Sequence, residues 1–185
     1  YPDGAGDVLA AFAAQLGADP DATAVTDAQT SLTRADLDAR ATAIARRLAR
    51  AGARPEHLVG IALERSCTML AAWLAVLRTG AAILPLNPEL PEARLVALAA
   101  EADLLLTQPE LADRSPALVD AAGRPPLVLN ARDDADDNAD EGAGEGAGED
   151  GARPFRPRTR APHPDALAYI LHTSGSTGTP KACAN

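Results

Sequence analysis

Short, continuous apolar runs separated by longer helical stretches are the feature that most restricts the fold of this chain. The runs occur at 57–63 (HLVGIAL), 80–87 (GAAILPLN), 103–107 (DLLLT) and 126–130 (PLVLN). In LVGIAL and DLLLT the apolar residues are consecutive, as in strands that are buried on both faces. Strands that alternate with helices form βαβ units, whose strands lie parallel in one sheet covered by helices. The sequence therefore predicts an α/β fold with a mainly parallel sheet.

The helical stretches carry recognisable boundary signals. Thr33 and Asp36 form a variant of the capping box, and an apolar stripe follows at steps of three and four residues up to Gly52, a helix stop. The stripe consists of Leu37, Ala41, Ile44 and Leu48. The same reasoning predicts helices over 34–51, over 67–78 with Ser66 as N-cap, and over 91–102, and a weaker helical stretch over 110–122. A short strand is predicted at 22–27.

Composition narrows the functional classes. Apolar residues make up 46% of the chain but aromatic residues only 3%, so Ala, Leu and Val must build the core, with Trp73 as its largest side chain. No signal peptide and no apolar run of about 18 residues is visible, which argues against a membrane protein. Cys67 and Cys183 lie far apart without metal-site spacing, so we expect no disulfide, no metal centre and a reducing, cytoplasmic location.

The net charge of −9 comes almost entirely from one segment. Residues 131–150 hold nine acidic residues and one arginine, while the other residues hold 17 acids and 16 bases. The part expected to fold is nearly neutral, which argues against a nucleic-acid-binding face. We divide the chain into an N-terminal α/β part (1–130), a low-complexity acidic and Pro/Arg-rich insert (131–164) and a returning strand and loop (165–185).

The insert is expected to be disordered, because it has almost no large apolar residue to offset the entropy of ordering. Four of its oxygen-bearing residues match positions 1, 3, 5 and 12 of a calcium-binding loop, but Ala139 stands where that loop needs Gly. The four are Asp134, Asp136, Asn138 and Glu145. A solvated linker is therefore the preferred interpretation, and no metal site is predicted.

The last segment joins an expected buried strand, ALAYIL (166–171), to a loop rich in Gly, Ser and Thr, HTSGSTGTPK (172–181). Backbone N–H groups, hydroxyls and one lysine suit phosphate, which offers many acceptor oxygens. A loop at the end of a strand would open at the carboxyl edge of the sheet, where open α/β sheets bind ligands. The Walker loop does not match, because Lys181 follows Gly178 by three residues instead of directly, and the loop also does not have the glycine spacing of the dinucleotide motif GxGxxG. On the chemistry alone, a phosphate loop and a polar surface turn both remain open.

Three segments together resemble the adenylate-forming (AMP-binding) superfamily. TSGSTGTPK resembles the phosphate-binding signature of that group, LTRADLDARATAIARRLARAG (32–52) its early helix, and VGIALERSCTMLAAWLAVLRTGAAILPLNPELPEARL (59–95) its second conserved block. The resemblance covers about residues 8–130 and 165–185, and is strongest to the N-terminal part of adenylation domains of nonribosomal peptide synthetases. Arg34, Ile83, Asn87 and the pair Ala182-Cys183 depart from the usual pattern.

The resemblance implies an ATP-dependent ligase that turns an amino or carboxylic acid into an acyl-adenylate and pyrophosphate, with Mg²⁺ as cofactor. The acyl group then passes to a phosphopantetheine thiol on a carrier domain outside this chain, with a condensation domain as a further partner. It implies ATP-binding roles for one loop, and no catalytic residue within the chain. The residues are Thr173, Ser174, Gly175, Ser176, Thr177, Gly178, Thr179 and Lys181.

The family's substrate pocket, metal-binding acid, hinge and mobile lysine follow this loop. Since the chain also begins at Tyr1 rather than Met, we expect a fragment with little or no adenylation activity by itself. An acyl-CoA synthetase fragment, a non-catalytic interaction module and, less well supported, a Walker-type NTPase are the alternatives. Which acid is activated does not follow from the sequence.

Overall fold

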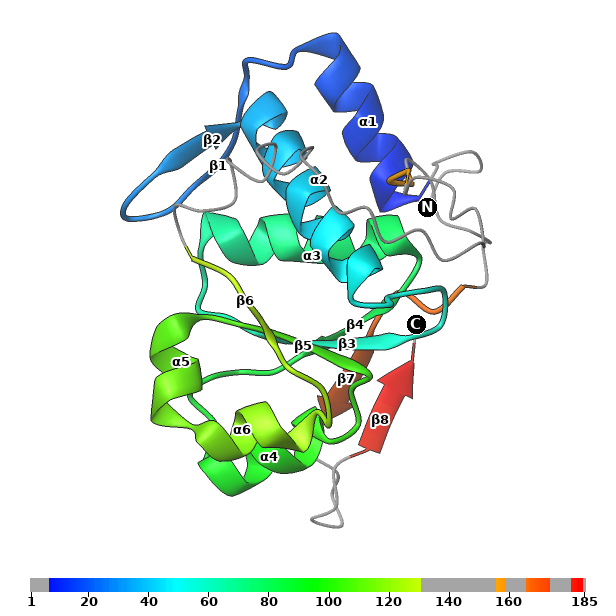
Figure 1. Cartoon of the computed structure of the whole chain (residues 1–185). Coiled ribbons are helices and arrows are strands. Elements are labelled where there is room, and N and C mark those ends of the chain that lie inside the picture. The colour runs from blue at the N-terminus through cyan, green and yellow to red at the C-terminus, as the bar shows by residue number, and fades with distance from the viewer. Residues whose placement is uncertain (1–6, 131–155, 159–165, 174–180, 185) are drawn as a thin grey trace, which may run out of the picture.

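A computed structural model describes residues 7–130, 156–158, 166–173 and 181–184. A parallel sheet lies between two layers of helices, with α1, α2 and α3 on one face and α4, α5 and α6 on the other (Figure 1). The elements in chain order are α1 (Val8–Ala18), β1 (Thr23–Thr26), β2 (Ser31–Thr33), α2 (Arg34–Arg50), β3 (Leu58–Ala62), α3 (Cys67–Thr79), β4 (Ala82–Pro85), α4 (Glu92–Ala99), β5 (Leu104–Thr107), α5 (Pro109–Arg114), α6 (Pro116–Ala121), β6 (Leu127–Val128), β7 (Ile170–Thr173) and β8 (Lys181–Ala184).

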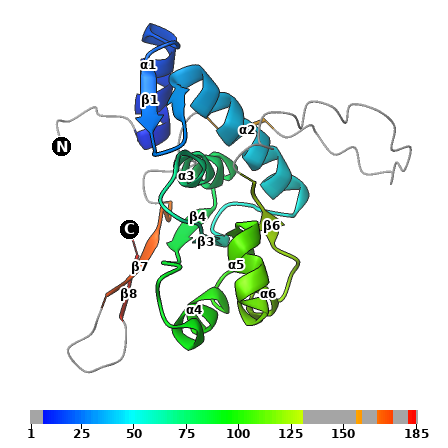
Figure 2. The ribbon, with the colours of Figure 1, turned by 90° about the vertical axis from the view of Figure 1, so that its left-hand side faces the viewer.

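The main sheet has the strand order β4-β3-β5-β6, and every neighbouring pair is parallel. This arrangement confirms the predicted α/β fold. All residues of β3 and β5 are buried, as their continuous apolar sequences require. The chain passes from β4 back across β3 to β5, so α3 and α4 cover opposite faces of the sheet (Figure 2).

Each face of the sheet has its own apolar core. Alternate residues of β5 divide between them, since Leu104 and Leu106 pack toward α2 and α3, whereas Leu105 packs toward α4 and α6. Gly60 in the central strand β3 makes the second core possible. A Cβ at Gly60 would lie 3.0 Å from Leu86 Cδ1 and 3.3 Å from Ala102 Cβ, so a larger residue would push these neighbours apart.

Helix α2 forms where its local signals place it. Thr33 Oγ1 accepts a hydrogen bond from Asp36 N (3.1 Å), and Thr33 N donates to Asp36 Oδ2 (3.0 Å), which completes the predicted capping box. The Thr33 hydroxyl also donates to Asp36 Oδ2 (2.7 Å), and this bond, followed by the one from Thr33 N, holds the pKa of Asp36 below its usual value. The apolar stripe is buried against α3 and the sheet, and Gly52 follows the helix with φ +92°, a conformation that glycine adopts without strain.

A buried arginine joins α2 to α3. Arg78 is 6% exposed, and its Nη2 donates to Asp38 Oδ1 (2.5 Å), while Nη1 donates to Asp38 O (3.0 Å) and Thr42 Oγ1 (2.8 Å). The guanidinium also lies over the ring of Phe12 in α1, 5.8 Å from its centroid. One side chain therefore makes polar or cation–π contacts with both other helices of this layer.

The strand predicted at 22–27 is confirmed as β1, but it lies outside the main sheet. β1 pairs antiparallel with β2, a strand that the sequence did not indicate. Asp27 holds this hairpin against α3, because its carboxylate accepts bonds from the backbone N–H groups of Cys67 (2.8 Å), Gln29 (2.9 Å) and Thr30 (2.9 Å). The bond from Cys67, followed by those from Gln29 and Thr30, holds the pKa of Asp27 far below its usual range.

Two further predictions differ in detail from the structure. Trp73, expected as the largest core side chain, is only partly buried, because the part of α3 that carries it faces a cleft at the sheet edge. The predicted helical stretch at 110–122 is two short helices, α5 and α6, since Pro116 cannot donate the backbone hydrogen bond that a continuous helix would need.

Removing the carboxylate beside Arg78 should destabilise the fold. In Asp38→Ala the guanidinium keeps only neutral partners, so we expect a loss of about 2–3 kcal/mol in the free energy of unfolding, measured with urea. Arg78→Met keeps much of the apolar packing without the charge and should cost less. Asp113→Ala, which removes an exposed carboxylate on α5, serves as the control. An unfolding free energy of Asp38→Ala equal to that of the control would contradict this role.

The Asp27 bonds predict a pH dependence of a defined sign. Because its pKa is lower in the folded than in the unfolded chain, Asp27 stabilises the fold fully above its ordinary pKa of 3.8 and progressively less as the pH falls below it. Asp27→Asn should therefore lower the melting temperature at neutral pH, and the difference from the unchanged protein should shrink below about pH 4. Asp21→Asn is the matched control. A difference that is constant across this pH range would exclude the proposed linkage.

Candidate functional site

The carboxyl edge of the sheet brings together four loops, because its strands are all parallel. The loops begin at Leu63, Leu86, Gln108 and Leu129, directly after β3, β4, β5 and β6. β3 lies between β4 and β5 in the sheet. The connection after β3 leads to the strand on one side of it, and the connection after β4 leads to the strand on its other side, so the strand order reverses here. Open α/β sheets bind ligands at such a reversal.

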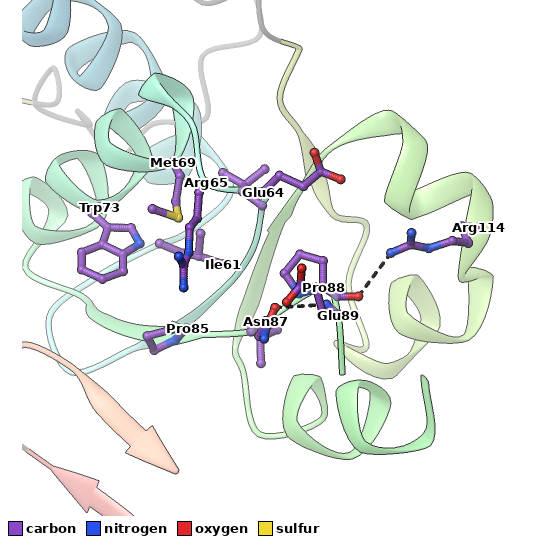
Figure 3. A pocket seen from close by; sticks show the side chains of 12 residues that line it. Ile61, Glu64, Arg65, Met69, Trp73, Pro85, Asn87, Pro88, Glu89 and Arg114 are labelled. Carbon is purple, nitrogen blue, oxygen red and sulfur yellow. Dashed lines mark hydrogen bonds between the residues drawn. The ribbon is translucent and has the colours of Figure 1, made fainter. Parts of the chain in front are cut away.

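Among the described residues, one cleft at this edge has a volume of about 740 Å³. Its apolar wall is made by Ile61, Met69, Trp73 and Pro85, while Arg114 extends from α5 on the opposite side (Figure 3). Its full lining is Ile61, Leu63, Glu64, Arg65, Met69, Trp73, Pro85, Leu86, Asn87, Pro88, Glu89 and Arg114. The loop after β4 is held in place by bonds from Glu89 N to Asn87 Oδ1 (3.0 Å) and from Arg114 Nη2 to Pro88 O (3.2 Å).

The second cleft, of about 890 Å³, lies between the β1–β2 hairpin and the loops after β3, β5 and β6. Its charged residues are Asp27, Arg40, Glu64, Arg65 and Glu110. Glu64 N donates to Gln108 Oε1 (2.9 Å) and so joins two of these loops. With charges of both signs in the lining, this cleft shows no preference for a strongly anionic ligand.

The C-terminal strands form a hairpin beside β4 (Figures 1 and 2). The strand expected at 166–171 begins later, at Ile170, and only Tyr169 pairs in parallel with Ile83 of β4. β7 then pairs antiparallel with β8 instead of extending the main sheet. Residues 174–180 of the loop lie outside the described part of the chain, so the expectation that the loop opens at the carboxyl edge of the parallel sheet stays a prediction.

The hairpin register places two of the predicted ATP-binding residues opposite each other. Thr173 ends β7, Lys181 begins β8, and the two are register partners. Opposed residues of antiparallel strands have Cα atoms about 4.5–5.5 Å apart. The other predicted residues lie outside the described part of the chain. These are Ser174, Gly175, Ser176, Thr177, Gly178 and Thr179.

His172, the residue before Thr173, makes a contact that sequence reasoning missed. Its Nε2 atom lies 3.2 Å from Glu101 Oε2, in the turn between α4 and β5, and its side chain is only 10% exposed. The sequence does not indicate this pair, because the two residues are distant in the chain and no sequence motif includes both of them.

The described residues give no evidence for metal or thiol chemistry. Within them, no group of three or more His, Cys, Asp or Glu side chains is placed to hold a metal ion. The calcium-like residues 134–145 are outside the described ranges. Burial, and then the hydrogen bond and charge of Asp27, raise the pKa of the Cys67 thiol, which fits a packing role. No helix in the described ranges is long and apolar enough to cross a membrane.

A family model described as "AMP-binding enzyme" matches residues 12–184. A linear gramicidin synthase protein of Brevibacillus parabrevis is 37% identical over 92% of this chain, and AMB antimetabolite synthetase AmbB of Pseudomonas aeruginosa is 39% identical over 94%. The phosphinothricin tripeptide synthetase PhsC of Streptomyces viridochromogenes is 39% identical over 88%. The chain spans only 2%, 12% and 14% of these three proteins, respectively.

Solved structures agree with these sequence matches. The nonribosomal peptide synthetase FmoA3, in its α-methyl-L-serine-AMP-bound form, has a TM-score of 0.71 at 30% identity, over 97% of this chain and 18% of that protein. VinN in complex with 3-methylaspartate has a TM-score of 0.73 at 25% identity, over 97% of this chain and 47% of VinN. The family model, the sequence matches and the similar solved structures together show that this chain belongs to the AMP-binding enzyme family, where it is most similar to the N-terminal part of nonribosomal peptide synthetase adenylation domains.

Proposed function

We propose that this chain holds the phosphates of ATP in an adenylation domain that converts an amino acid into aminoacyl-AMP and pyrophosphate. The observation that carries the proposal is the extent of the family match, which runs through β7, the TSGSTGTPK loop and β8 to residue 184. The register of Thr173 with Lys181 supports it, because both ends of the loop then lie at one end of the hairpin.

The chemistry requires that negative charge be neutralised as pyrophosphate leaves. The loop from Thr173 to Gly178 would supply backbone N–H groups and hydroxyls to the β- and γ-phosphates, and Lys181 would supply a positive charge beside them. These residues bind and orient ATP, and Thr179 belongs to the same loop. None of them is proposed to exchange a proton or form a covalent bond with the substrate.

Magnesium would enter this site with the nucleotide. Mg²⁺ in nucleotide sites is usually held by phosphate oxygens and one or two carboxylates. Within the described residues no group of three or more His, Cys, Asp or Glu side chains is placed to hold a metal ion, and we assign no Mg²⁺ ligand to them. The loop's donors and Lys181 suit the phosphates, and bound Mg²⁺ would neutralise part of their charge.

An amino acid is the preferred substrate class. FmoA3 is solved with α-methyl-L-serine-AMP and also in an AMPPNP-bound form, and VinN is solved with 3-methylaspartate and with L-aspartate. These neighbours favour amino acid activation over the acyl-CoA synthetase alternative. A phosphopantetheine thiol on a carrier domain would receive the aminoacyl group, with a condensation domain as the next partner. A cytoplasmic location, where thiols stay reduced, is part of the proposal.

The single lysine permits a direct test of ATP binding by the 185-residue chain. Labelling with ¹⁵N-lysine should give one backbone amide signal, from Lys181. We expect this signal to shift saturably with Mg-ATP and less with AMP, which lacks the β- and γ-phosphates. Arg50→Gln, a change on the exposed side of α2, should leave this titration unaltered. An amide signal that responds to neither nucleotide would contradict the proposed phosphate site.

Loss of the lysine charge should affect ATP more than the amino acid. In a longer synthetase that contains this chain, we expect Lys181→Ala to raise the KM for ATP about tenfold or more, because a charge-assisted bond to phosphate is lost. The KM for the amino acid should change little. Amino-acid-dependent ATP–pyrophosphate exchange measures both, and Lys181→Arg, which keeps the charge, is the control. Unchanged ATP kinetics would remove Lys181 from the site.

The 185-residue chain alone should not complete the reaction. In the adenylate-forming family that this chain resembles, the residues that select the substrate and the mobile catalytic lysine follow the phosphate loop. We therefore expect amino-acid-dependent ATP–pyrophosphate exchange at background level, even where the Lys181 amide reports ATP binding. Exchange that rises above background with any amino acid would show that this chain is sufficient for catalysis.

A further inference from the structure

The hairpin β7–β8 has few polar attachments to the rest of the molecule within the described residues. The Tyr169–Ile83 bridge and a bond from Ile83 N to Ala168 O (2.9 Å) join its start to β4. Leu167 N donates weakly to Glu56 Oε1 (3.4 Å), and Ile170 packs against the core under α4. All of these contacts lie just before β7 or at its first residue, away from the end at which Thr173 meets Lys181.

Among the contacts of the described residues, the His172–Glu101 pair lies nearest to that end. Nε2 of His172 lies 3.2 Å from Glu101 Oε2, with side-chain exposures of 10% and 48%. Along β7, Ile170 packs into the core and Leu171 is 44% exposed, so His172 lies on the inner face with Ile170. An imidazole with a proton on Nε2, whether neutral or charged, can donate to this carboxylate.

Glu101 lies in a turn that is itself held in place by hydrogen bonds. Glu101 N donates to Leu98 O (3.1 Å), which closes the end of α4. Two residues later, Asp103 N donates to Leu58 O (2.8 Å) and Asp103 Oδ2 accepts from Leu58 N (2.8 Å). The carboxylate that meets His172 is thus carried by a turn bonded to the central strand β3.

We infer that His172 is a positioning residue for ATP binding. Its contact with Glu101 holds the far end of β7 against the α4 layer, and thereby sets the position of Thr173 and Lys181 relative to the sheet. The inference deepens the proposed function and rests on it, because it names the support of the phosphate site. His172 acts through the backbone that follows it and is not proposed to touch ATP.

Two readouts test this role separately. Amide hydrogen exchange of β7 and β8 reports whether the hairpin is tethered, and the Lys181 amide titration with Mg-ATP reports binding. We expect His172→Ala and Glu101→Ala each to speed exchange in the hairpin and to weaken ATP binding about three- to tenfold, as for the loss of one partly exposed charge-assisted bond. The double variant should be no worse than either single variant, since both remove one contact.

A conservative variant separates the contact from the packing of the imidazole. His172→Gln keeps an N–H donor for Glu101 and should recover much of the tethering and the binding that His172→Ala loses. Asp120→Ala, an exposed carboxylate change on α6 in the same layer, should behave like the unchanged chain in both readouts. If Gln and Ala at position 172 give equal losses, the hydrogen bond is not the cause and the inference is overturned.

The outcomes distinguish this inference from the proposed function. Normal ATP binding with unaltered exchange in His172→Ala would overturn the tether and leave the phosphate site intact. Faster exchange with unaltered ATP affinity would overturn the positioning role. If the unchanged chain shows no response to ATP, the proposed function and the positioning role fail together, and the exchange data alone decide whether the tether exists.

Discussion

The complete burial of the two central strands is the constraint on which the rest of the structure depends. β3 and β5 have no exposed residue, so each face of the sheet must be covered by helices that bring apolar side chains of their own. α2 and α3 do this on one face, and α4 and α6 on the other. The missing side chain at Gly60 lets the second layer approach closely. The connections that carry the helices across the sheet then place the following loops at a single edge.

Polar contacts then determine how the parts outside the sheet are attached to this frame. Arg78 with Asp38 fastens α2 to α3, and Asp27 with the backbone of Cys67 fastens the β1–β2 hairpin to the start of α3. In the same way, the contact of His172 with Glu101 joins the β7–β8 hairpin to the turn after α4. In each pair a charged group binds a partner on another element, which offsets its partial burial and restricts how that element can lie.

The β7–β8 hairpin distinguishes the predicted phosphate loop of this chain from other nucleotide-binding loops. In the Walker and dinucleotide motifs the loop leads into a helix, whose N-terminus attracts the phosphate. Here a strand follows, so a helix at that end cannot provide the attraction, and the proposal depends on loop donors and Lys181 instead. This explains in physical terms why a long run of hydroxyl-bearing and Gly residues stands between two short strands. It also makes the support of those strands important for binding.

Local signals in the sequence were sufficient for the fold class, for the boundaries of α2 and α3 and, through the motif TSGSTGTPK with its upstream blocks, for the family. Caps and apolar periodicity act within one or two helical turns, and a binding motif is contiguous, so each can be read from neighbouring residues. The β2 strand, the partial exposure of Trp73 and the three charged contacts could not be predicted in this way. Asp27 and Cys67 are 40 residues apart, and only the packing of the elements that carry them brings such pairs together. The sequence by itself determined what kind of sheet forms and which motif it carries, whereas the tertiary structure decided how the motif's strands are held.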